Sequence, residues 1–188
     1  MPDRPTIVHE FDWPDRVVVG TVGRPGERTF YLQARTGPRS TSVVLEKEQS
    51  AVLADKLDEL LGALAADPRS GVTVPAETPA ELVDDDPLDQ PVEEEFRVGT
   101  MRLSWDPRTA QVVIEAHPLV LPDEDDGDEP EPDDDEPAEK LVVRIPVGTA
   151  RAFVQRTRQV VRAGRPACPF CGQPVDEDGH VCPPPQAV

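Results

Sequence analysis

Residues 16–46, RVVVGTVGRPGERTFYLQARTGPRSTSVVLE, decide the fold because apolar runs alternate in them with turn sequences. The runs 16–22, 29–35 and 41–46 are rich in β-branched and aromatic residues and predict three strands. GRPGER and TGPRS, which separate them, predict tight turns, because proline and glycine supply the backbone angles that turns require. These residues therefore predict three strands in succession.

A helix is predicted directly after these strands, at about residues 47–65. Its leucines recur at intervals of three and four residues, which places them on one face of a helix. The leucines of this predicted face are Leu53, Leu57, Leu60, Leu61 and Leu64.

The second half of the chain repeats this order of elements. VGTV at 19–22 is echoed by VGTM at 98–101, and each opens the first strand of its half. The sequence therefore predicts an α+β fold of tandem βββα repeats, a pseudo-symmetric body with an antiparallel sheet and two helices on one side. Residues 6–11 are predicted to add an edge strand. The second set of elements is predicted at strands 95–105, 110–117 and 140–147 and helix 148–164. One face of this helix is formed by Ala150, Phe153, Val154, Thr157, Val160 and Val161.

The acidic residues are concentrated in two segments. The chain of 188 residues has a net charge of −18, from 19 basic and 37 acidic residues. Residues 81–95 contain eight acids and residues 123–139 contain twelve, and neither segment contains a base. The surrounding segments 66–94 and 121–139 are predicted to be disordered or loosely held, because they carry too little apolar surface to offset the entropy of ordering.

The composition excludes several functional classes. The acidic balance argues against nonspecific binding to nucleic acid or to anionic membranes. No apolar run approaches the roughly 20 residues of a membrane span, and the N-terminus lacks the apolar stretch of a signal peptide. We therefore expect a cytoplasmic protein without membrane contacts. Its predicted parts are residues 1–65, the linker 66–94, residues 95–164 with the insert 121–139, and a zinc-binding tail at 165–188.

All three cysteines lie in that tail, in the stretch ACPFCGQPVDEDGHVCPPP. Their pattern is Cys168-x₂-Cys171-x₈-His180-x-Cys182, which provides the four ligands of a tetrahedral zinc site. Because four ligands fill the coordination of Zn²⁺, the site is expected to be structural and to fold the tail as a zinc knuckle. A redox-active CxxC pair and plain surface cysteines are the alternatives.

Two weaker patterns concern charged side chains. Arg151, Arg158 and Arg162 share one face of the second predicted helix, as an anion site requires, although a solvated charged face has the same pattern. His9 lies among Glu10, Asp12 and Asp15, where acid–base chemistry is one interpretation and an exposed N-terminal segment is the other.

Three stretches together resemble a known family. VVGTVGRPGERTFYLQAR, TSVVLEKEQ and RPACPFCGQPVDEDGHVCP are similar to an uncharacterised actinobacterial repeat-protein family, the domain-of-unknown-function family 3090. The resemblance implies a repeat protein with a terminal Cys/His cluster, and it implies no activity. Basic residues often follow the last cysteine in that family, whereas PPPQAV follows it here, which argues against a basic role for the end of the chain.

Three functions are compatible with these patterns. The sequence favours a non-enzymatic interaction or adaptor module that binds a protein partner, because no known catalytic motif is present. The first alternative is an enzyme or enzyme subunit that acts on a phosphorylated small ligand in a groove between the repeats, with His9 and Arg35 as candidates. The second is nucleic-acid binding through the zinc tail and the arginine face.

Overall fold

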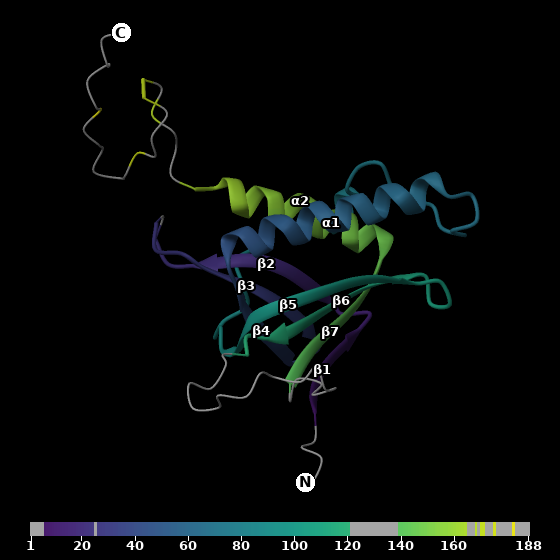
Figure 1. Ribbon diagram of the computed structural model, residues 1–188, viewed down its shortest axis with the longest axis horizontal. Coiled ribbons are helices and arrows are strands. Elements are labelled where there is room, and N and C mark those ends of the chain that lie inside the picture. Colours follow the sequence, from purple (N-terminus) through teal and green to yellow (C-terminus); the bar gives the residue numbers. More distant parts are fainter. Residues whose placement is uncertain are drawn as a thin grey trace, which may run out of the picture.

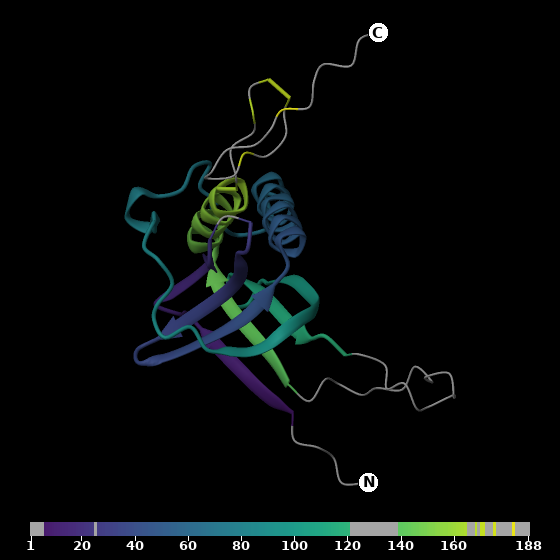
Figure 2. The ribbon, with the colours of Figure 1, turned by 90° about the vertical axis from the view of Figure 1, so that its left-hand side faces the viewer.

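A computed structural model describes residues 6–24, 26–120 and 139–164, together with Cys168, Phe170, Cys171, Val175 and Cys182. The fold is α+β, with a seven-stranded mixed sheet and two helices that lie side by side (Figures 1 and 2). This confirms the predicted class. The elements are β1 (Ile7–Asp12), β2 (Arg16–Val22), β3 (Thr29–Thr36), β4 (Arg39–Leu45), α1 (Lys47–Ala66), the 3₁₀ helix η1 (Ala80–Leu82), β5 (Glu94–Asp106), β6 (Gln111–Pro118), β7 (Glu139–Pro146) and α2 (Val147–Arg162).

The strand order across the sheet is β1-β7-β6-β5-β4-β3-β2. β2, β3 and β4 pair antiparallel in succession, and so do β5, β6 and β7. The predicted antiparallel sheet is wrong at two places, because β4 pairs with β5 and β1 with β7 in parallel. The physical reason is the crossover: α1 and the chain after it carry the backbone back to the end of the sheet where β4 began.

The predicted N-terminal edge strand is present as β1. It lies at one end of the sheet and pairs only with β7, in a register that places His9 opposite Leu141. Phe11 of β1 is fully buried, whereas Ile7 and Val8 are exposed. The edge strand is therefore anchored to the core near its C-terminal end.

The core lies between the sheet and the two helices. Alternate residues of each strand face it, such as Leu32 and Ala34 of β3, and the helices cover them with apolar faces. The predicted helix faces are confirmed in their central residues, while Leu60, Val160 and Val161 are only partly buried. The apolar helix residues that are fully or almost fully buried are Leu53, Ala54, Leu57 and Leu61 of α1 and Ala150, Phe153 and Val154 of α2.

The segment between α1 and β5 is held more tightly than its composition predicts. Residues 84–90, which we call the acidic strap, pass over the face of β2 and β3 that points away from the core. Leu88 is buried there, and a Cβ atom at Gly20 would lie 2.6 Å from its side chain. Gln33, which is also buried, donates to the backbone oxygen of Asp89 (3.1 Å) and accepts from its backbone N–H (2.8 Å).

Arginines bind the acidic strap from three elements. Arg16 of β2 contacts Asp84 at 2.6 Å and Asp89 at 3.1 Å, and Arg35 of β3 contacts Asp89 at 2.8 Å. Arg156 of α2 contacts Asp84 at 2.8 Å. The prediction of a loosely held linker therefore fails at the strap, because these ion pairs and the buried Leu88 compensate for its low apolar content. Of the predicted insert 121–139, residues 121–138 lie outside the described part of the chain, and Glu139 begins β7.

Replacing Gly99 with alanine is expected to destabilise the protein by about 1–3 kcal/mol, the usual cost of overpacking. A Cβ atom there would lie 2.7 Å from the Cα of Leu119 and 2.9 Å from the backbone oxygen of Pro118, and backbone cannot rotate away. Gly62 provides the control, since it lies within α1 with nothing within 4 Å of its Cβ position. Gly62→Ala should be neutral or stabilise by up to about 1 kcal/mol. Urea unfolding measures the stability of both variants. Equal stability would contradict the close packing of Gly99 against Pro118 and Leu119.

Candidate metal centre

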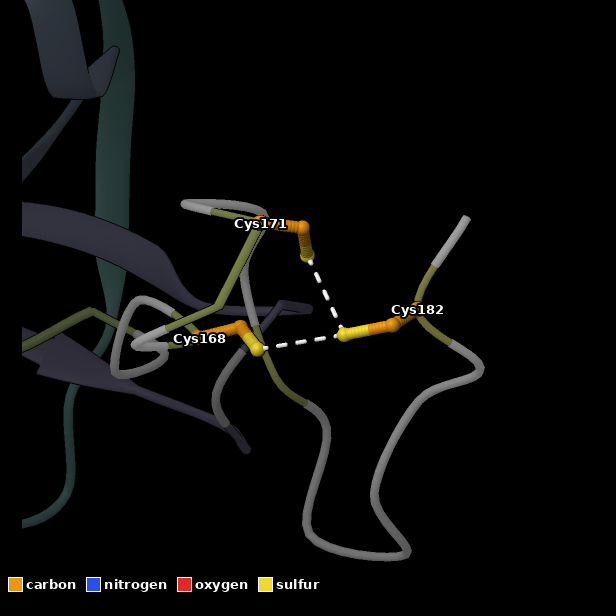
Figure 3. A group of neighbouring side chains, drawn as sticks. All are labelled: Cys168, Cys171 and Cys182. Carbon is orange, nitrogen blue, oxygen red and sulfur yellow. Dashed lines mark hydrogen bonds between the residues drawn. The ribbon is translucent and has the colours of Figure 1, made fainter. Parts of the chain in front are cut away.

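Three cysteines from the end of the chain converge on one point. The Sγ atoms of Cys168 and Cys182 are 3.4 Å apart, and those of Cys182 and Cys171 are 3.6 Å apart. Figure 3 shows the three side chains pointing toward one another, although Cys182 is eleven residues beyond Cys171. All three are free thiols. The arrangement brings together three of the four side chains that the spacing identified as ligands.

The backbone of the CPFC turn is directed at one of the sulfurs. The N–H of Phe170 donates to the Sγ of Cys168 at 3.4 Å. Hydrogen bonds from the backbone N–H groups of Phe170 and Cys171 lower the pKa of Cys168 to about 7. Hydrogen bonds with Cys168 and Cys171 raise the pKa of Cys182 to about 12. The turn thus stabilises the thiolate of Cys168. The nearby sulfurs oppose ionisation of Cys182, and a bound cation would offset the repulsion between the thiolates.

This chemistry suits a metal ion. Thiolates bind soft and borderline ions, and sulfur ligands about 2.3 Å from a shared Zn²⁺ lie within about 4 Å of one another. The observed Sγ separations fit that requirement, so the cluster can hold a metal ion. The fourth predicted ligand, His180, lies outside the described residues.

An aromatic side chain lies between the first two cysteines and faces solvent. Phe170 is 90% exposed, more than the other exposed large apolar residues of the described part of the chain. Its ring is accessible to a partner, although single exposed apolar residues are common on protein surfaces.

The predicted arginine face is found along α2, but two of its members are paired with α1. Arg151 forms an ion pair with Asp58 and donates to the backbone oxygen of Pro75 at 3.1 Å. Arg158 contacts Asp55 at 2.8 Å and Asp58 at 3.1 Å. These pairs explain the excess of bases on α2 and of acids on α1. Arg151, Arg158 and Arg162 line a groove of about 640 Å³ between α2 and residues 76–78.

His9 does not meet the acids that neighbour it in the sequence. Its Nε2 lies 2.7 Å from a carboxylate oxygen of Glu139 on β7, and Glu95 of β5 lies nearby. Glu10 instead contacts Arg144 at 3.3 Å. The other residue of the enzyme hypothesis, Arg35, is engaged by Asp89 of the acidic strap.

Sequence reasoning also missed the buried Arg156. Only 8% of this residue is exposed, and it binds both β2 and the acidic strap. Its position in the helical period gave the one available signal, because it lies next to the predicted apolar positions 153, 154 and 157.

Comparison with known proteins places the chain in a family without adding an activity. The sequence model of the family described as "Protein of unknown function (DUF3090)" matches residues 9–182, a region that includes both helices and the three cysteines. Searches of curated proteins and of solved structures found no match. No helix within the described residues is long and apolar enough to cross a membrane.

Proposed function

We propose that this chain, which belongs to the DUF3090 family, is a zinc-binding interaction module rather than an enzyme. The observation that carries the proposal is the convergence of Cys168, Cys171 and Cys182, with Sγ atoms 3.4 Å and 3.6 Å apart. In our proposal Zn²⁺ binds the three thiolates and His180, so that no coordination position is left open for substrate. Such a site organises backbone and performs no catalysis.

The proposed zinc site gives a short segment a fixed shape. Residues 165–188 contain few large apolar side chains, so hydrophobic burial alone gives them little folding free energy. Metal binding supplies that free energy directly, which is how zinc knuckles fold. The site requires reduced thiols, and the cytoplasm keeps thiols reduced. We therefore propose a cytoplasmic location.

The proposed body is a tandem βββα repeat that carries the zinc knuckle. Two groups of three antiparallel strands, each followed by a helix, support this interpretation. The last strand of the first group, β4, lies beside the first strand of the second group, β5. The repeats would thus follow one another head to tail along one sheet, with α1 and α2 packed side by side.

Phe170 is the proposed contact residue for a protein partner. Phe170→Ala should remove the partner that the full chain captures from a lysate of its own cells, because the exposed ring lies on the metal-ligand turn. Val52→Ala is the control, since Val52 of α1 is also exposed (56%) and apolar. Mass spectrometry of the captured proteins, with and without nuclease, measures the effect.

The outcomes separate the interaction module from its alternatives. A protein lost with Phe170→Ala and kept with Val52→Ala supports the proposal. A partner kept by Phe170→Ala and also by a chain ending at Gly164 would move recognition to the body. Loss of the partner on nuclease treatment would favour nucleic acid.

One observation favours the phosphorylated-ligand alternative. Arg151, Arg158 and Arg162 line the same groove, so an anion there would meet three guanidinium groups. The pairing of Arg151 and Arg158 with Asp58 weighs against it, because an anion would have to compete with a carboxylate already in place.

A further inference from the structure

The second candidate ligand cluster of the described residues lies at the edge of the sheet, away from the cysteines. It consists of His9 on β1, Glu139 at the start of β7 and Glu95 near the start of β5. One ligand atom from each residue lies within 4.8 Å of the other two. Three residues that are at least 44 positions apart in the sequence therefore bring nitrogen and oxygen donors to one point.

Two carboxylates and one imidazole meet at this point. Glu95 and Glu139 bring two carboxylates close together, and His9 forms a hydrogen bond with Glu139 at 2.7 Å. Two carboxylates at such a distance repel each other, so a bound cation would stabilise the cluster. His9 and Glu139 are partly shielded from water, with 20% and 27% of their side chains exposed, which reduces the screening of that repulsion.

We propose that His9, Glu95 and Glu139 bind a divalent first-row transition ion, such as Mn²⁺, Co²⁺ or Ni²⁺. An imidazole together with carboxylates suits these ions, and water would complete the coordination. Ligand atoms on one such ion lie roughly 3 Å apart, given bond lengths of about 2 Å. The 2.7 Å contact of His9 with Glu139 already approaches that spacing, and the side chain of Glu95 has room to move because it is exposed. The ion would take the place of the hydrogen bond between His9 and Glu139.

The proposed ion would join the edge strand to the rest of the sheet. β1 pairs only with β7, and its N-terminal residues Ile7 and Val8 are exposed. An ion held by β1, β5 and β7 would attach the N-terminal half of β1, in addition to its pairing with β7 and the burial of Phe11. Ligands that bind only the folded state stabilise it by mass action, so the ion should also raise the melting temperature.

Titration of the full-length ¹⁵N-labelled protein with Mn²⁺, followed by NMR, tests the site. Mn²⁺ prefers oxygen and nitrogen donors to thiolates, so the cysteines can remain loaded with Zn²⁺. Paramagnetic broadening is expected first at the amides around His9, Glu95 and Glu139. His9→Ala and, as a conservative change that keeps the side-chain size, Glu139→Gln should each weaken the titration at least about 10-fold. Glu10→Gln is the matched control, because this neighbouring acid on β1 contacts Arg144 instead.

The outcomes decide the proposal in both directions. Site-selective broadening that His9→Ala and Glu139→Gln weaken and Glu10→Gln keeps supports it, as does a melting temperature that Mn²⁺ raises in the wild type and in Glu10→Gln but not in His9→Ala or Glu139→Gln. Broadening that is spread over the acidic segments, or that has equal strength in all four proteins, would overturn it. If His9→Ala fails to fold, Glu139→Gln decides alone. A lack of zinc at the cysteines would contradict the proposed function and leave this test unaffected.

Discussion

Replacing Arg156 with alanine is expected to lower the free energy of unfolding by about 2–3 kcal/mol, because it removes several hydrogen bonds from a charged, largely buried donor. Arg156 donates to the backbone oxygen of Val19 at 3.1 Å, to the carboxylate of Asp84 at 2.8 Å and to the backbone oxygen of Asp86 at 2.6 Å. It therefore joins α2 to β2 and to the acidic strap. Alanine would leave these acceptors without this donor in a largely buried place.

Arg158→Ala is the matched control for this experiment. It removes the same side chain from the same helix, but its partners Asp55 and Asp58 are 64% and 34% exposed, and solvent-exposed pairs contribute about 0–1 kcal/mol. Urea unfolding followed by circular dichroism gives both values. In the Arg156→Ala variant, amide exchange should also become faster in residues 84–90. A loss below about 1 kcal/mol, equal to that of Arg158→Ala, would show that the acidic strap does not depend on Arg156.

The electrostatics of the acidic strap agree with this role. A hydrogen bond from Arg16 lowers the pKa of Asp84, and burial lowers the pKa of Arg156. Asp84 therefore remains ionised between two arginines at neutral pH. The strap carries much of the acidity of residues 81–95, and part of that charge is neutralised within the fold.

Replacing Cys168 with serine is expected to weaken zinc binding at least about 100-fold. Structural zinc sites bind with roughly 10–16 kcal/mol, so one of four ligands contributes about 3 kcal/mol, and each 1.4 kcal/mol corresponds to a factor of ten. Competition with a chromophoric chelator in the presence of a reductant measures the affinity. Cys171→Ser, Cys182→Ser and His180→Ala should show losses of similar size.

Phe170→Ala is the control for the zinc measurement, because Phe170 lies between two of the ligands and its exposed ring donates no electron pair. It should bind zinc as tightly as the wild type. Affinity that His180→Ala leaves unchanged would remove His180 from the ligand set while preserving a three-cysteine site. Affinity unchanged in every cysteine variant would show that zinc binds elsewhere.

Much of the fold follows from local patterns in the sequence. The leucine period of 47–65 predicts α1, and alternating apolar residues predict the strands to within about two residues. The parallel pairs could not be predicted in this way, because strand direction depends on where the crossover returns the chain. The acidic strap was also hidden, since its composition resembles a solvated linker and its partners Arg16, Gln33 and Arg156 come from distant elements.

The two candidate metal sites also differ in how far the sequence alone predicts them. Cys168, Cys171 and Cys182 lie within 15 residues, so their spacing alone predicts that they bind one metal ion. His9, Glu95 and Glu139 become neighbours only through the pairing of β1 with β7 and the path of β5. The acids next to His9 in the sequence made this histidine a candidate residue. They did not predict its partners in the structure, because alternate residues of a strand face opposite sides.

The most direct test of the central claim is the mass of the native protein, measured after purification under reducing conditions without added metal. We predict one zinc ion per chain, lost on acidification together with the appearance of three reactive thiols. Cys168→Ser should lack the zinc ion under the same conditions. A native mass equal to that of the bare chain, with three thiols that react at once and no zinc taken up on addition, would contradict the zinc site and the interaction module built on it.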